Sequence, residues 1–140
     1  MLMKKKLFLI GAILAVLAIA AAAFWPRGGD VRDVQRIPAR NTMYSQEDID
    51  IAMDIAIEAF SNGFEGCKLL SIAYDEAETL AEIDRQRERY GEIQFLILVS
   101  EFYVGDNAEP CFEPGTTYGG WKWIFRDDGD GWKLVNWGYA

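Results

Sequence analysis

The sequence predicts an α+β domain that follows an N-terminal apolar segment. Two stretches carry apolar residues at the helical spacing, and the strand candidates carry them at a spacing of two or without interruption. Their order is helix, strand, helix and then three strands, which predicts an antiparallel sheet with both helices packed on one face. We place the boundaries at residues 1–25 for a signal anchor or signal peptide, 26–41 for a flexible linker and 42–140 for the α+β domain.

The N-terminal segment begins with Lys4, Lys5 and Lys6 and continues as an unbroken apolar run over residues 7–24. As a helix this run spans about 27 Å, close to the thickness of the hydrocarbon core of a bilayer. It is either an uncleaved anchor that passes through the membrane, or a signal peptide cut near the alanines at 21–23. Since the lysines stay in the cytoplasm, we expect the domain outside it, tethered to the cell membrane by a single pass or secreted after cleavage.

Composition argues against several classes of function. The chain has 22 acidic and 14 basic residues, a formal net charge of −8, so the domain repels nucleic acid rather than binding it. It contains no histidine, which removes the commonest general base and the commonest zinc ligand. We therefore expect no metal and no cofactor.

The two cysteines are Cys67 and Cys111. Outside the cytoplasm a disulfide is permitted, and this one would close a loop of about 45 residues, worth about 3–4 kcal/mol. Two separate thiols are the alternative, and the spacing does not decide between them. The pair is therefore a candidate disulfide.

The first predicted helix begins at Ser45, whose side chain can cap it, and ends at Asn62-Gly63. Its predicted apolar face consists of Ile49, Ala52, Met53, Ala56 and Phe60. The remaining elements are a strand over 68–74, a charged surface helix over 75–90, a strand over 93–104 that is apolar on both faces, and strands over 116–126 and 132–139. Residues 127–131 between the last two strands hold three aspartates and indicate a hairpin turn rather than a calcium loop.

Aromatic residues gather in the last two strands. Trp121 and Trp123 share one face of their strand by the period of two. By the same rule Trp137 and Tyr139 share a face of the next strand, opposite to that of Leu134. These rings either fill the helix–sheet core or line an apolar pocket that stacks on a ligand. Trp121, Trp123, Trp137 and Tyr139 are the candidate ligand-binding or partner-binding residues.

Glu101 is a carboxylate inside the otherwise apolar strand over 93–104. It either points toward the covered side of the sheet, where burial would suit it to acid–base chemistry, or lies exposed near the end of the strand.

Three segments carry a family resemblance: SQEDIDIAMDIAIEAF, FEGCKLLSIAYD and WKWIFRDDGDGWKLVNWGY. Together they resemble small extracytoplasmic bacterial domains akin to the NTF2-like (cystatin-like) α+β superfamily, over roughly residues 45–139. The resemblance implies a curved sheet around a helix, with a cone-shaped cavity. Some relatives are isomerases or dehydratases that use an acid–base pair in this cavity, and others bind ligands or proteins without catalysis.

We therefore expect a membrane-tethered extracytoplasmic module that binds a protein, a cell-envelope component or a small ligand without catalysis. The membrane would be contacted through residues 7–24. The alternative is a small cavity enzyme of the NTF2-like type, working through Glu101, Tyr103 and Tyr74.

Overall fold

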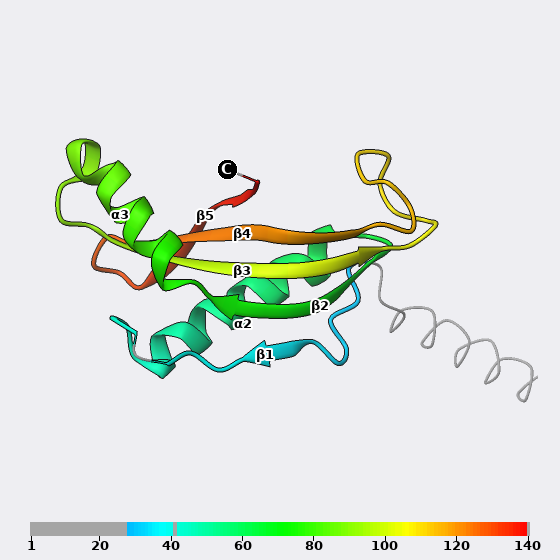
Figure 1. Ribbon diagram of the computed structural model, residues 1–140, viewed down its shortest axis with the longest axis horizontal. Coiled ribbons are helices and arrows are strands. Elements are labelled where there is room, and N and C mark those ends of the chain that lie inside the picture. Colours follow the sequence, from blue (N-terminus) through cyan, green and yellow to red (C-terminus); the bar gives the residue numbers. More distant parts are fainter. Residues whose placement is uncertain (1–27, 41, 140) are drawn as a thin grey trace, which may run out of the picture.

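The computed structural model describes residues 28–40 and 42–139, which form five strands and two helices (Figure 1). The strands follow one another across a single sheet in the order β1-β2-β3-β4-β5. The α+β class predicted from the sequence is confirmed. The elements are β1 (Gln35–Ile37), α2 (Gln46–Gly63), β2 (Cys67–Tyr74), α3 (Glu76–Tyr90), β3 (Gln94–Val104), β4 (Thr117–Asp127) and β5 (Trp132–Gly138).

The sheet is mixed rather than wholly antiparallel. Strands β2 to β5 pair antiparallel as predicted, but β1 adds to the edge of β2 in parallel. Nearby, the Asp30 N–H donates to the Cys67 carbonyl at 2.8 Å, and the Leu69 N–H donates to the Asp30 carbonyl at 2.9 Å. Part of the predicted linker is therefore paired with the sheet, because backbone pairing at an edge needs no apolar pattern.

The prediction that both helices pack on one face is wrong. Helix α2 lies behind the sheet in Figure 1 and α3 lies in front of one end. Leu96, Leu98 and Phe102 of β3 belong to the core beneath α2, whereas Phe95 and Ile97 form a second cluster against α3. Because successive side chains of a strand alternate between faces, a strand that is apolar on both faces requires a cover on each side.

Helix α2 forms as its sequence pattern predicts. The Ser45 hydroxyl accepts a hydrogen bond from the Asp48 N–H at 3.2 Å, which caps the start of the helix. The helix ends where the Phe64 N–H donates to the Phe60 carbonyl at 3.0 Å. The five residues predicted for its apolar face are all buried: Ile49, Ala52, Met53, Ala56 and Phe60.

The predicted membrane segment, residues 7–24, lies outside the described residues. Within residues 28–40 and 42–139, no helix combines the length and the apolar character that crossing a membrane requires.

Candidate functional site

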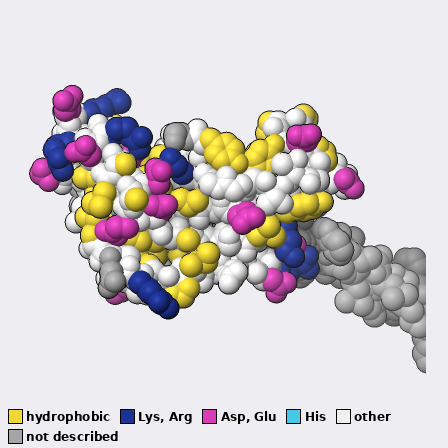
Figure 2. All heavy atoms as spheres, viewed as in Figure 1, with side chains coloured by type: hydrophobic (Ala, Val, Ile, Leu, Met, Phe, Trp, Pro, Cys, Tyr) yellow, Lys and Arg dark blue, Asp and Glu magenta, His cyan; other side chains and the backbone are white. Residues whose placement is uncertain are grey.

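A groove walled by aromatic side chains lies on the α2 face of the sheet. It is bounded by the C-terminal end of α2, by β4 and β5, and by the loop from Gly105 to Thr116, and its volume is about 690 Å³. The groove lies on the far side in Figure 2, which shows the other face of the sheet, with charged side chains gathered over α3. We call it the aromatic groove; its lining residues are Ala59, Asn62, Gly63, Phe64, Glu109, Cys111, Phe112, Tyr118, Trp121, Trp123, Trp137 and Tyr139.

The four aromatic residues singled out in the sequence all line this groove. The sequence pattern predicted the wrong face of the sheet for Trp137. Ile124 pairs with Asn136, but the next residue, Phe125, pairs with Leu134, so Val135 is an extra residue in β5. Such a bulge shifts the alternation by one and brings Trp137 opposite Trp123, on the face that Leu134 shares.

A second bulge supplies the other wall. Ser100 pairs with Trp121 and Phe102 with Tyr118, so Gly119 and Gly120 together oppose Glu101. Gly120 has a φ of 72°, a conformation that residues with a Cβ rarely adopt. Tyr118 and Trp121 are therefore three residues apart and both face the groove.

The rings of the groove differ in exposure, and they meet both stacked and edge to face. Trp123 is fully buried and forms the floor, with the Trp137 ring stacked at a centroid distance of 6.4 Å. Trp137 is 53% exposed and Tyr139 is 58% exposed, so both present ring surface to solvent. The Trp121 and Tyr139 rings meet edge to face at 5.3 Å and 72°. Open ring faces beside a buried floor can stack on a ligand.

Of two indole N–H groups beneath the groove, one has a hydrogen-bond partner and the other has none. The Trp123 Nε1–H donates to the Ser100 hydroxyl at 2.9 Å, which satisfies it inside the core. The Trp121 Nε1–H is buried and has no hydrogen-bond partner among the described residues. An unpaired buried donor costs about 1–3 kcal/mol.

The rim of the groove rests on a close backbone contact. Gly66 has a φ of 78°, and a Cβ built on it would lie 2.6 Å from the Ala108 backbone nitrogen. The Gly66 carbonyl also accepts from the Gly105 N–H at 2.8 Å. The absence of a side chain at Gly66 thus lets the rim loop, which carries Glu109 and Cys111, reach its position.

The two cysteines are free thiols in the structure. Cys67 is buried at the start of β2, and burial raises the pKa of its thiol to about 11. Cys111 is exposed on the groove rim, with its Sγ 4.0 Å from Glu109 Oε2. The alternative of two separate thiols is the arrangement observed.

The electrostatic character of the groove is negative. Among its lining residues, all within the described part of the chain, Glu109 is the one ionisable carboxylate and there is no Lys or Arg. The wall formed by Asn62 and Gly63 is the C-terminal end of α2, whose last turn contains no basic residue. A helix C-terminus carries a partial negative charge.

The candidate acid–base residues do not come together. Glu101 and Tyr103 lie exposed on the open face of β3, opposite to the aromatic groove. Tyr74 borders the same shallow depression as Glu101, but its hydroxyl is buried on the α2 face, where its ring lies 6.2 Å from that of Tyr44. Burial is the main cause that raises the pKa of Tyr74 well above its ordinary value, which disfavours it as a base.

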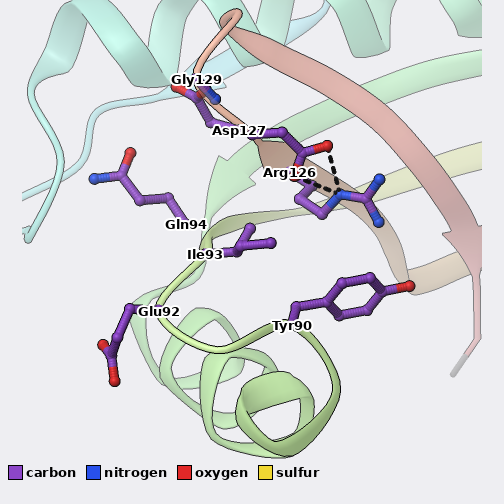
Figure 3. A pocket seen from close by; sticks show the side chains of 8 residues that line it. Tyr90, Glu92, Ile93, Gln94, Arg126, Asp127 and Gly129 are labelled. Carbon is purple, nitrogen blue, oxygen red and sulfur yellow. Dashed lines mark hydrogen bonds and ion pairs between the residues drawn. The ribbon is translucent and has the colours of Figure 1, made fainter.

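A second depression, of about 610 Å³, lies where α3 meets the turn between β4 and β5 (Figure 3). The Arg126 guanidinium lies 4.9 Å from the centroid of the Tyr90 ring and pairs with Asp128 at 3.0 Å. Asp127 Oδ1 accepts the N–H groups of Gly129 and Gly131 at 2.7 and 3.2 Å, which confirms the predicted turn. Because these polar groups hold the turn together, we assign no site to this depression. The candidate site is therefore the aromatic groove.

Neither a metal site nor a similar protein indicates a function for the groove. Within residues 28–40 and 42–139, no three His, Cys, Asp or Glu side chains are grouped so as to hold a metal ion. No protein family model matches the chain, and no match was found among curated proteins or solved structures. The resemblance to the NTF2-like superfamily therefore stays a prediction from the sequence motifs.

Proposed function

We propose that this chain is a membrane-tethered extracytoplasmic module that binds a small organic ligand in the aromatic groove without catalysis. The observation that carries the proposal is the pairing of open ring faces, Trp137 and Tyr139, with a fully buried floor, Trp123. A volume of about 690 Å³ is within the range of small-molecule sites, roughly 300–1,000 Å³. The proposed tether rests on the apolar run over residues 7–24 behind three lysines.

The cavity-enzyme alternative has no geometric observation in its favour. Its three residues lie on opposite faces of β2 and β3, and the Tyr74 hydroxyl is buried away from Glu101. The groove holds one carboxylate within the described residues, Glu109, and the thiol of Cys111 lies 4.0 Å from it on the exposed rim. Rings around a single carboxylate suit binding better than proton transfer.

Replacing Trp137 by alanine is expected to weaken the binding of phenol, a neutral and water-soluble ring probe, roughly tenfold. The reason is that the open ring face above Trp123 is lost. Binding is measured by ligand-observed NMR on the full chain kept in solution with a maltoside detergent.

The matched control is Tyr103→Ala, which removes a similarly exposed aromatic ring (43%) from the other face of the sheet. This variant is expected to bind phenol as the unmodified chain does, and both variants should unfold cooperatively. Equal loss of binding in the two variants, or none in either, would contradict the proposed site.

A further inference from the structure

We infer that the aromatic groove selects small organic cations of the quaternary ammonium type, a specificity that rests on the proposed function. Three independent features of the described groove favour a positive ligand. They are the open ring faces, the carboxylate on the rim and the C-terminal end of a helix.

The ring faces supply the first attraction. The π faces of Trp and Tyr are electron-rich and attract a cation within about 6 Å of the ring centroid. Trp121 meets Tyr139 at 72° and Phe112 at 67°, so the Trp121 ring stands steeply to two neighbouring walls. A rounded trimethylammonium head contacts several steep walls at once, whereas a flat ring stacks on one.

The carboxylate and the helix end supply the second and third attractions. Glu109 is exposed on the rim, and the loop that carries it, between Gly105 and Gly115, also holds Asp106 and Glu113 and no basic residue. The last turn of α2 adds its partial negative charge at Asn62 and Gly63. Within the described lining residues there is no Lys or Arg to oppose a cation.

A quaternary ammonium fits this combination better than a small inorganic ion. Its methyl groups spread the charge over an apolar surface, so it loses little hydration energy when it enters a groove lined mainly by rings. An inorganic cation needs several oxygen ligands, and the groove offers one carboxylate. The occupant we assign is a free small molecule, in keeping with the size of the groove.

The test compares choline with 3,3-dimethylbutan-1-ol, its uncharged analogue of nearly the same shape. Both are titrated by NMR into the full chain in maltoside, a detergent without a choline head group. Choline is expected to bind about tenfold more tightly than the neutral alcohol, and the preference should shrink as salt is added. Glu109→Gln should reduce the preference severalfold, while Glu88→Gln, which removes the same charge from the distant helix α3, should leave it unchanged.

Equal or tighter binding of the neutral alcohol overturns the inference, as does the absence of choline binding. Phenol separates this failure from failure of the proposed function. If phenol still binds and Trp137→Ala still weakens it, the groove is a binding site without cation preference. If phenol does not bind either, the proposed function fails together with the inference.

Discussion

Replacing Phe102 by alanine is expected to lower the free energy of unfolding by about 3–5 kcal/mol. Phe102 is fully buried in β3, and its loss leaves a cavity at the centre of the core beneath α2. Since small domains are stable by only about 5–15 kcal/mol, a sizeable unfolded fraction is expected near 37 °C. Its ring contacts five others at centroid distances of 5.3–5.7 Å: Phe60, Phe64, Phe112, Tyr118 and Trp121.

Urea unfolding of the full chain in maltoside, followed by tryptophan fluorescence, measures this loss. The control is Leu80→Ala, which truncates an apolar side chain that is 52% exposed on α3 and should change the stability by less than about 0.5 kcal/mol. A loss of under about 1 kcal/mol for Phe102→Ala would show that the described core is wrong. The variant should also lose phenol binding, because four of the five contacted rings line the aromatic groove: Phe64, Phe112, Tyr118 and Trp121.

Gly66→Ala is expected to cost at least about 1–3 kcal/mol of stability and to weaken ligand binding as well. Two effects add: an alanine is strained at a φ of 78°, and its Cβ would lie 2.6 Å from the Ala108 backbone nitrogen. Because that contact is with backbone, the rim loop has to move rather than a flexible side chain. Glu109 and Cys111 move with it.

Gly115→Ala separates the two effects. Gly115 has nearly the same φ, 80°, and lies in the rim loop itself, but no atom lies within 4 Å of the position of a Cβ. The Gly115→Ala variant should lose stability through backbone strain alone and keep most of its affinity for phenol. If the two variants lose stability and affinity equally, the close approach at Gly66 does not position the rim. Urea unfolding and the phenol titration provide both readouts.

The sequence predicted the helices and four of the strands because each has its own apolar period or an uninterrupted apolar run. The apolar face of α2, from Ile49 to Phe60, is a case where the period alone suffices. Strand β1 could not be predicted in this way, since Gln35–Ile37 is short and exposed and is held by backbone pairing with β2. The placement of α3 on the opposite face was implicit in β3, whose Phe95 and Ile97 need a cover of their own.

The sequence singled out four aromatic residues of the groove, Trp121, Trp123, Trp137 and Tyr139, but not their geometry. The period of two places Trp137 opposite to the face of Leu134, and the extra residue Val135 reverses this. Nothing in the local sequence marks Val135 as a bulge, because a bulge depends on the register with the partner strand. The contribution of Phe112 and Glu109 from the rim loop was likewise missed, since a loop has no period. The Gly119-Gly120 pair was the one available signal of a bulge.

The central claim, that the aromatic groove binds a small ligand, is tested most directly through the indole N–H resonances of the tryptophans. Trp121, Trp123 and Trp137 line the groove, whereas Trp132 lies at the other end of β5, with its ring 5.0 Å from that of Tyr44. In a phenol titration of the isotope-labelled full chain, we predict saturable shifts of the Trp121 and Trp137 signals and a stationary Trp132 signal. Groove signals that stay fixed, or that shift no more than the Trp132 signal, would contradict the claim.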